Sequence, residues 1–261
     1  MSEIPEEPTT PPLVIGATGG SGTQVVARIV ARAGYELGDN LNVSDDAMDF
    51  VAFHDEWISR MLAAERDHQH FSDRQLFQRR ADFDLALARH CAGVKGPKWG
   101  WKAPRSIYLL PFLDERFPGL KFIHVLRDGR DMAFSKNQNQ LRKHGPEILS
   151  WRERWICPRA VQSILLWDRV NRRAAAYAEQ HLGDRYLRLR FEELCREPVP
   201  AINRLLTFLG ASADAEEIAR EEISPPSTLG DWRDQRPAML ARMMEVAPEG
   251  LRQFGYESAG A

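Results

Sequence analysis

The residues best suited to chemistry lie near the N-terminus, in a glycine-rich turn that directly follows a short apolar run. Residues 13–16 predict a strand, the turn reads GATGGSGT over residues 16–23, and apolar residues recur at helical spacing over residues 24–32. Such a strand–turn–helix unit points backbone N–H groups and the positive end of the helix dipole at a ligand above the turn. The hydroxyls of Ser21 and Thr23 can cap the helix or donate to that ligand. The unit predicts a phosphate or sulfate site, and a turn that only packs closely is the alternative.

The spacing of the turn fits neither of two common phosphate-binding motifs. An ATP-binding loop has the form GxxxxGK[ST], whose lysine reaches the β- and γ-phosphates, and this turn contains no lysine. A dinucleotide-binding turn has the form GxGxxG, and Val25 stands where its last glycine belongs. The turn is therefore predicted to hold an anion without being a standard ATP or dinucleotide loop.

A second candidate anion site follows the apolar run at residues 121–126. Arg127 leaves this predicted strand at its carboxyl end, where ligands bind in open α/β sheets, and Ser135 follows about two helical turns later. A guanidinium supplies paired donors to phosphate oxygens, so this pair suits a second phosphate. A cluster of ion pairs among Arg127, Asp128, Arg130 and Asp131 is the structural alternative.

The elements that must position these residues alternate between strands and helices. Strands are expected at residues 13–16, 98–101, 121–126 and 186–189, and helices at about residues 47–64, 73–92, 107–117, 158–181 and 197–209. This βα rhythm predicts an α/β fold with a central parallel sheet flanked by helices. Residues 12–261 are expected to form a single domain after a disordered lead at residues 1–11, and residues 224–236 to form a long functional loop.

The composition argues against several other classes of protein. The chain of 261 residues carries 35 Lys and Arg against 37 Asp and Glu, so binding to nucleic acid through bulk charge is not expected. Three scattered cysteines, with no CxxC and no zinc-like His spacing, predict neither a disulfide framework nor a metal site. No apolar run approaches the roughly 20 residues of a membrane helix, and the acidic, Pro-rich N-terminus is unlike a signal peptide. We therefore expect a cytoplasmic protein with no membrane and no nucleic-acid partner.

With both anion motifs present, the chain resembles the family of sulfotransferases that use 3′-phosphoadenosine 5′-phosphosulfate (PAPS). In that family a loop of the form [K/R]SGT[T] holds the 5′-phosphosulfate, and an Arg and a Ser with seven residues between them bind the 3′-phosphate. Residues 21–23 (SGT) and the pair Arg127 and Ser135 match these motifs. The resemblance implies that PAPS is the co-substrate, released as adenosine 3′,5′-bisphosphate (PAP), and that no metal takes part. It also implies that the phosphosulfate is bound by Gly19, Gly20, Ser21, Gly22, Thr23 and Gln24.

Three further stretches extend the resemblance over residues 12–256. WKAPR at residues 101–105 is similar to the K-x-P segment of the family, whose lysine, here Lys102, contacts the transferring sulfuryl group in the tyrosylprotein branch. LRFEEL at residues 189–194 is similar to an RYEDL stretch, with Phe191 in place of a Tyr that lies near the adenine, and a Phe can also stack on a base. LGDWR at residues 229–233, which contains Trp232 and Arg233, is similar to a loop that closes over the nucleotide. The resemblance implies a P-loop-NTPase-like α/β fold.

The chain departs from the family at Gly20, where most members carry a Lys or Arg. Sulfuryl transfer needs positive groups on the sulfuryl oxygens and on the bridging oxygen of the departing nucleotide, where charge builds up. Lys102 is expected to supply the missing charge, helped by the backbone amides of residues 20–23 and by Arg105. The alternative for Lys102 is an exposed lysine at a strand end.

A general base must take the proton of the acceptor, and the family uses either a His or a carboxylate. After the first predicted helix the sequence offers Asp46 and Asp45 as the favoured candidates, with His54 behind them. A helix cap or a solvated face is the alternative for each of these residues.

The acceptor is expected to be a small molecule or a carbohydrate that offers a hydroxyl or an amine. The basic stretch at residues 136–159, which contains Trp151 and Trp155, predicts either an acceptor cleft for a sugar or anionic substrate, or a helix pair with Trp in its core. Two other functions stay open: a P-loop kinase of a small molecule, against which the missing lysine argues, and a catalytically weak sulfotransferase homologue, which Gly20 keeps open. The oligomeric state is not predicted.

Overall fold

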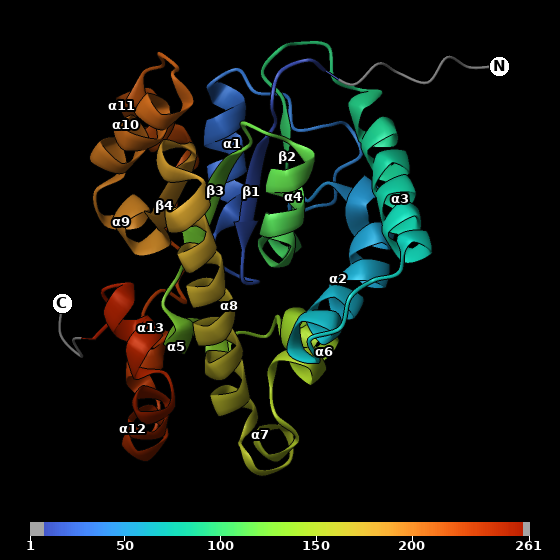
Figure 1. Cartoon of the computed structure of the whole chain (residues 1–261). Coiled ribbons are helices and arrows are strands. Elements are labelled where there is room, and N and C mark those ends of the chain that lie inside the picture. The colour runs from blue at the N-terminus through green and yellow to red at the C-terminus, as the bar shows by residue number, and fades with distance from the viewer. Residues whose placement is uncertain (1–7, 258–261) are drawn as a thin grey trace.

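The strands form one sheet of four parallel strands in the order β2-β1-β3-β4 (Figure 1). The computed structural model describes residues 8–257, and the strands span Leu13–Ala17 (β1), Gly100–Lys102 (β2), Lys121–Leu126 (β3) and Tyr186–Arg190 (β4). In the register, Leu13 lies opposite both Gly100 and Lys121, and Phe122 lies opposite Tyr186. The first strand of the chain is therefore an inner strand, and every residue of β1 is buried, which is why its sequence is an unbroken apolar run.

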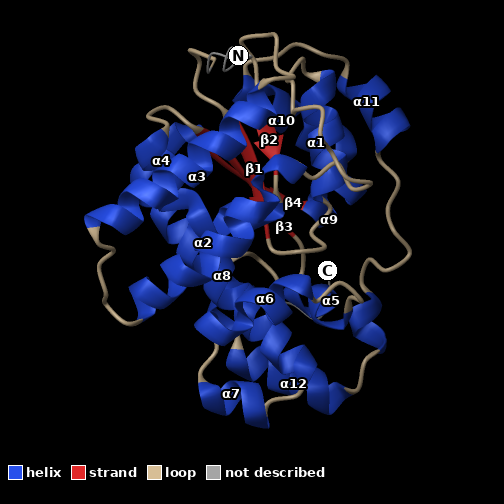
Figure 2. Ribbon diagram, turned by 90° about the vertical axis from the view of Figure 1, so that its right-hand side faces the viewer, coloured by secondary structure: helices blue, strands red, loops and turns tan. Residues whose placement is uncertain are grey.

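Successive residues of β1 face two different hydrophobic cores. Leu13 and Ile15 pack in the core beneath α1, α10 and α11, whereas Val14 packs on the other face in the core formed with α2, α3, α4 and α8. These helices span Thr23–Arg32 (α1), Val51–Arg66 (α2), Asp73–Cys91 (α3), Leu110–Arg116 (α4), Arg159–His181 (α8), Pro198–Leu209 (α10) and Ala215–Glu222 (α11). The sheet is thus enclosed between two helical layers (Figure 2).

A third hydrophobic core lies beyond the carboxyl ends of the strands, around the first half of α8 (Figure 1). Trp167 of α8 contributes to it, together with Leu126 at the end of β3. The helices gathered here are Gly129–Phe134 (α5), Asn139–Ile148 (α6), Trp151–Ile156 (α7), Pro237–Val246 (α12) and Pro248–Gln253 (α13). This layer brings the arginine turn, the segment after it and the C-terminal segment to the same edge of the sheet. The remaining elements are Phe191–Arg196 (α9) and the 3₁₀ turns Met48–Phe50 (η1), Pro104–Leu109 (η2), Gly183–Arg185 (η3) and Asp231–Asp234 (η4).

The predicted fold class is confirmed, and the expected elements are found with shifted ends. The helix expected at residues 107–117 is divided between η2 and α4, and the strand expected at 98–101 begins only at Gly100. The expected loop at residues 224–236 contains the short turn η4. In the expected disordered lead, residues 1–7 lie outside the described residues, and the carbonyl of Thr10 accepts a hydrogen bond from Trp99 Nε1 at 2.7 Å. Within residues 8–257, no helix is both long and apolar enough to cross a membrane.

Candidate functional site

The glycine turn between β1 and α1 leaves the N-terminus of a ten-residue helix open to a ligand. Gly20 and Gly22 have φ angles of 86° and 80°, in the left-handed region that favours glycine. Gly22 is the N-cap of α1, no side chain caps the helix, and its first turn contains no acidic residue. A Cβ atom at Gly22 would also lie 2.2 Å from the ring of Phe191. The first amides of α1 are therefore available to an anion, and Gly22 lets Phe191 approach them closely.

Two polar side chains of the turn are engaged within the protein. The buried hydroxyl of Ser21 donates to the carbonyl of Thr18 at 2.6 Å, which closes the turn on itself. Gln24 donates from Nε2 to the carbonyl of Val43 at 3.1 Å. The turn is thus shaped by its own hydrogen bonds, and its capacity for an anion lies mainly in its backbone amides.

Arg127 leaves the end of β3 and faces the glycine turn. Its Nη1 donates to the carbonyl of Gly20 at 3.5 Å, and its guanidinium lies 5.7 Å from the centre of the Phe191 ring. Its Nη2 donates to the backbone carbonyl of Thr228 at 2.6 Å and to Asp131 at 3.3 Å. Its Nε is buried and has no hydrogen-bond partner among residues 8–257. Arg127 therefore takes part in the predicted cluster of ion pairs, through Asp131, and also faces the glycine turn as the anion-site prediction requires.

Ser135 lies close to the same point of the glycine turn. Its hydroxyl is 3.7 Å from where a Cβ atom of Gly20 would stand, and it accepts a hydrogen bond from the amide of Asn137 at 3.2 Å. Arg127 and Ser135, which the motif pairs, thus converge on Gly20.

The loop at residues 224–236 is fixed to the arginine turn by Asp131. The carboxylate of Asp131 accepts hydrogen bonds from the amides of Gly230 and Trp232, at 2.7 Å and 3.1 Å. The guanidinium of Arg130 stacks on the buried Trp232, 3.6 Å from the ring centroid, and Arg233 packs against the same ring at 4.7 Å. Trp232 and Arg233 therefore support the loop, and neither lines the cavity described below.

Lys102 ends β2 and is buried in the wall of the site. Its side chain is only 2% exposed, and Nζ lies 2.5 Å from Oδ1 of Asp46. Nζ also donates to the carbonyl of Ser44. The structure thus overturns the alternative of an exposed lysine, because this cation is withdrawn from solvent and held by two acceptors.

The three candidate bases have different surroundings. Asp45 has a φ of 61°, pairs with Arg28 at 3.3 Å and does not line the cavity, whereas Asp46 lines it but pairs with Lys102. His54 lines the cavity and is 3% exposed. Burial lowers the pKa of His54 well below its usual value, and the nearby charge of Arg105 lowers it further. His54 is therefore a neutral imidazole at neutral pH, with a lone pair able to accept a proton.

One cavity of about 640 Å³ collects most of the predicted residues. Its walls include residues 19–24 of the glycine turn with Asp46, His54, Lys102, Arg127 and Phe191, and they exclude Asp45, Ser135, Trp232 and Arg233. Within residues 8–257, no group of three or more His, Cys, Asp or Glu residues is placed to hold a metal ion.

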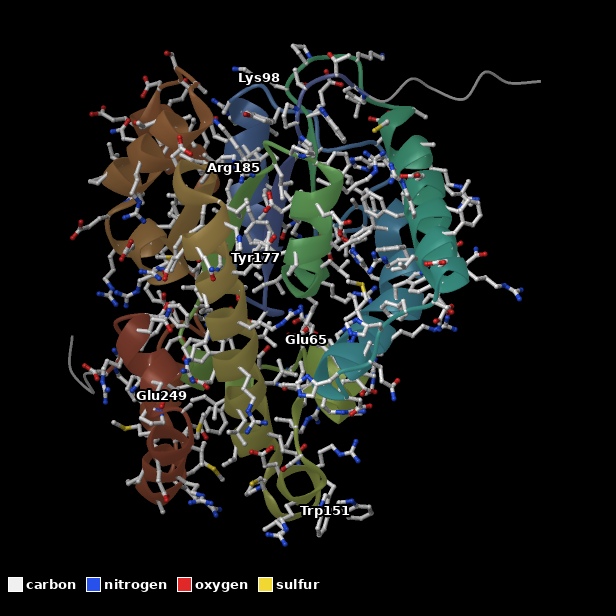
Figure 3. The ribbon with its side chains drawn as sticks, viewed as in Figure 1. Glu65, Lys98, Trp151, Tyr177, Arg185 and Glu249 are labelled. Carbon is white, nitrogen blue, oxygen red and sulfur yellow. The ribbon has the colours of Figure 1, made fainter. Side chains whose placement is uncertain are left out.

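The sequence motifs did not single out Gln140, which α6 contributes to the wall of this cavity. Gln140 lines it, donates from Nε2 to the carbonyl of Ala17 at 3.2 Å, and accepts from the hydroxyl of Tyr108 at 2.8 Å. A single Gln in a basic, polar stretch carries no signal of this position. The tryptophans of the same stretch lie elsewhere, since Trp151 and Trp155 are 63% and 81% exposed on α7, and Figure 3 shows Trp151 at one end of the molecule. The predicted Trp core is therefore wrong, and the tryptophans do not line the cavity, whereas Arg142 and Lys143 of the same basic stretch do.

A parallel sheet whose first strand feeds an uncapped helix through a glycine turn, with an arginine of the adjacent strand facing that turn, defines an α/β protein with groups suited to an anion at the carboxyl edge of its sheet. The chain belongs to the sulfotransferase family, whose sequence model matches residues 12–215. The resemblance drawn from the motifs is therefore confirmed. A search of the curated proteins found no match.

Solved structures of sulfotransferases are similar to this chain over nearly its whole length. The sulfotransferase STF9 from Mycobacterium avium has a TM-score of 0.56 at 13% identity, with 97% of this chain and 79% of that chain covered. The sulfotransferase domain of the Synechococcus PCC 7002 olefin synthase has a TM-score of 0.55 at 16% identity, with 98% of each chain covered. Mouse sulfotransferase SULT7A1, solved in complex with PAP, has a TM-score of 0.53 at 15% identity, with 93% of this chain and 85% of that chain covered. These likenesses establish the fold.

Proposed function

We propose that the protein transfers the sulfuryl group of PAPS to a hydroxyl or amine of a small-molecule or carbohydrate acceptor. The observation that carries this proposal is the meeting of two anion-binding elements, the open N-terminus of α1 and the Arg127 side chain, in a cavity that also contains a buried lysine. The ribose of PAPS carries a phosphosulfate at its 5′ position and a phosphate at its 3′ position. These two anionic groups match the two anion-binding elements. Family membership and the PAP complex of the mouse enzyme support the assignment.

In this proposal each part of PAPS is bound by a different element. The amides at the start of α1 bind the 5′-phosphosulfate, because a helix N-terminus favours an anion. Arg127 and Ser135 bind the 3′-phosphate, for which Arg127 exchanges its hydrogen bond to the carbonyl of Thr228. Phe191, which packs against both Gly22 and Arg127, offers a ring face to the adenine.

The transfer step places a lone pair of the acceptor oxygen or nitrogen on sulfur. The bond from sulfur to the bridging oxygen breaks, and PAP leaves with that electron pair. Negative charge accumulates on the bridging and sulfuryl oxygens, where Lys102 and the turn amides stabilise it. Gly20 has a backbone conformation that suits glycine, so a Lys or Arg at this position would be strained. Lys102 is the buried cation that takes over the role of the Lys or Arg that most members of the family carry there.

We assign the base to His54. His54 lines the cavity, and no carboxylate of residues 8–257 engages its ring in an ion pair, so its imidazole can meet the acceptor there. The carboxylate of Asp46 is engaged by Lys102, so its role is to position that lysine. Asp45 lies outside the cavity walls, so the proposal gives it no role in the reaction.

The first experiment measures the thermal shift caused by PAP, and separately by ATP with Mg²⁺. Wild-type protein is compared with Arg127→Ala and with Lys98→Ala, a control at the amino ends of the strands and outside the cavity (Figure 3). A ligand that binds only the folded state stabilises it, by about 2.7 kcal/mol when its concentration is 100 times its Kd. The melting temperature rises accordingly. PAP is expected to stabilise wild type and Lys98→Ala but not Arg127→Ala. Stabilisation by ATP with Mg²⁺ and not by PAP would identify a kinase and refute the proposal.

Turnover is then measured as transfer of labelled sulfate from PAPS to a panel of alcohols, phenols, amines and sugars. Gly20 keeps a second function open, that of a nucleotide-binding homologue with little catalytic power. PAP binding without turnover on any acceptor of the panel would favour that second function.

A further inference from the structure

The cavity continues past the proposed nucleotide groups into a region walled by α2, the start of η2 and α6. α2 packs against both η2 and α6, and Figure 1 shows α6 beside α2. Val51 and His54 of α2, Arg105 of η2, and Arg142 and Lys143 of α6 line this region. None of these side chains has a part in binding PAPS in the proposed function, so the region is available to the acceptor.

Positive charge dominates the walls of the cavity. Its lining contains five Lys and Arg side chains but a single carboxylate, that of Asp46. Lys102 and Arg127 are assigned to the nucleotide, and Lys102 is already paired with Asp46. Arg105, Arg142 and Lys143 therefore form an additional cationic group in the acceptor region, called here the cationic wall.

The cationic wall is only partly neutralised. Arg105 and Lys143 both contact the same oxygen of Asp55, Oδ1, so one carboxylate is shared by two cations. Asp55 stands outside the cavity lining, and its side chain is 44% exposed. Arg142 donates to the side-chain carbonyl of Asn139 at 2.8 Å, and no carboxylate of residues 8–257 pairs with it. The wall thus keeps an excess of positive charge.

Arg105 is the member of the wall most withdrawn from water. Its side chain is 15% exposed, against 38% for that of Lys143. A charge in such a position interacts strongly with an approaching anion, because the surrounding medium screens it less than water does.

The lowered pKa values of two buried histidines, His54 and His144, indicate a positive electrostatic field in this region. The pKa of His144 is lowered to about 4, first by burial and then by the charges of Arg105 and Lys143. The same two cations also lower the pKa of His54. Asp55 acts in the opposite direction on both histidines, but on each its effect is smaller than that of Arg105, so the three charges together produce a positive local field.

We propose that the acceptor carries an anionic oxyacid group, a carboxylate, phosphate ester or sulfate ester, which is bound by Arg105, Arg142 and Lys143. This inference rests on the proposed function, since it concerns the second substrate of the same cavity. Guanidinium and ammonium groups bind such oxyanions through charge-assisted hydrogen bonds. The cationic wall therefore selects hydroxyl or amine compounds that also bear an acid.

The test measures binding to PAP-saturated protein by calorimetry, with matched pairs of probes that differ in charge. The pairs are 4-hydroxyphenylacetate with 4-hydroxyphenylacetamide, and glucose 6-phosphate with glucose. The acid of at least one pair is expected to bind wild type at least about tenfold more tightly than its neutral partner, as one charge-assisted contact allows. Equal binding of both members in each pair, or no binding by either acid, would overturn the inference.

Variants of the wall give effects of opposite sign. Arg105→Gln with Lys143→Gln is expected to reduce the preference for the acid to about threefold or less, and Lys98→Gln to leave it unchanged. Arg142→Gln, an exposed substitution that leaves the fold intact, is expected to weaken the acid about threefold by itself. Asp55→Asn removes the carboxylate that Arg105 and Lys143 share. It is therefore expected to raise the affinity for the acid about threefold or more and to leave the affinity for the neutral probe unchanged. An unchanged or weaker acid affinity in Asp55→Asn would contradict the assignment.

The two proposals fail in different ways. Failure of wild-type protein to bind PAP removes the proposed function. PAP binding together with indifference to the charge of the probe removes only the inference about the acceptor.

Discussion

Replacing Lys102 by Met tests the chemistry of the site most directly, because it removes the charge and keeps an unbranched side chain that is only one atom shorter. In the structure this side chain is 2% exposed, with Nζ 2.5 Å from Asp46. If Lys102 stabilises the charge that develops on the sulfuryl and bridging oxygens, its loss affects the transition state more than the bound substrates.

The expected magnitude follows from the burial of Lys102. One preorganised donor in a site that excludes water contributes about 2.7–4 kcal/mol to transition-state stabilisation, so kcat is expected to fall by about 10²–10³. The affinity for PAP is expected to change by about threefold or less, because the turn amides and Arg127 remain. The free energy of unfolding is expected to change by about 1 kcal/mol, since the carboxylate of Asp46 is 30% exposed and can be solvated once Lys102 is gone.

The assay combines single-turnover sulfuryl transfer with PAP binding and denaturant unfolding of the same variant. Lys102→Arg serves as the matched control, because it keeps the charge in a different geometry, and it is expected to lie between Met and wild type. A kcat within about threefold of wild type in Lys102→Met would refute the catalytic role. A parallel loss of PAP affinity and kcat would instead place Lys102 in ground-state binding.

Three other predictions follow from the site and the core. Gly22→Ala forces a side chain into a left-handed backbone position against Phe191, so it is expected to cost about 1–3 kcal/mol of stability and to abolish the thermal shift by PAP; a normal shift would show that the turn is not the anion site. Asp131→Asn removes the charged acceptor of two loop amides and is expected to cost about 1.5–3 kcal/mol and to speed proteolysis within residues 224–236; unchanged cleavage would show that the loop is held by other contacts. Burial holds the pKa of both His124 and His144 at about 4, below the unfolded value of 6.5. The unfolded chain then binds more protons between these values, so stability is constant above pH 6.5 and falls on acidification by about 1.4 kcal/mol per pH unit for each histidine. Urea unfolding at pH 7, 6 and 5 measures this loss, and an unchanged midpoint at pH 5 would contradict it.

The inner strands β1 and β3 could be predicted from the sequence because they are buried on both faces. The apolar run of β1 and the mainly apolar run of β3, which also contains Lys121 and His124, are visible without any knowledge of their partners. β2 was harder to delimit, since only Gly100–Lys102 pairs with β1 and the preceding residues belong to a loop. The position of Arg127 followed from the rule that ligands bind at the carboxyl ends of parallel strands.

The surroundings of the site could not be predicted, because they depend on contacts between distant residues. Asp45 and Asp46 are adjacent in the sequence, yet one pairs with Arg28 and the other with Lys102. The left-handed conformation of Asp45 separates them, and no local pattern encodes it. The cationic wall combines Arg105 with Arg142 and Lys143 through the packing of α6 against α2, which the sequence does not reveal.

The inner position of β1 has a consequence for how the chain folds during synthesis. Leu13 pairs with Gly100 on one side and with Lys121 on the other, so both edges of β1 lack their partners while the first hundred or so residues emerge from the ribosome. Such long-range pairings slow folding, because the entropy of closing the intervening loops is lost before the contacts form. An unpaired apolar strand is also a template for aggregation. A nascent chain cut off before β3 should therefore depend on chaperones, whereas one that extends past β4 contains every strand of its sheet.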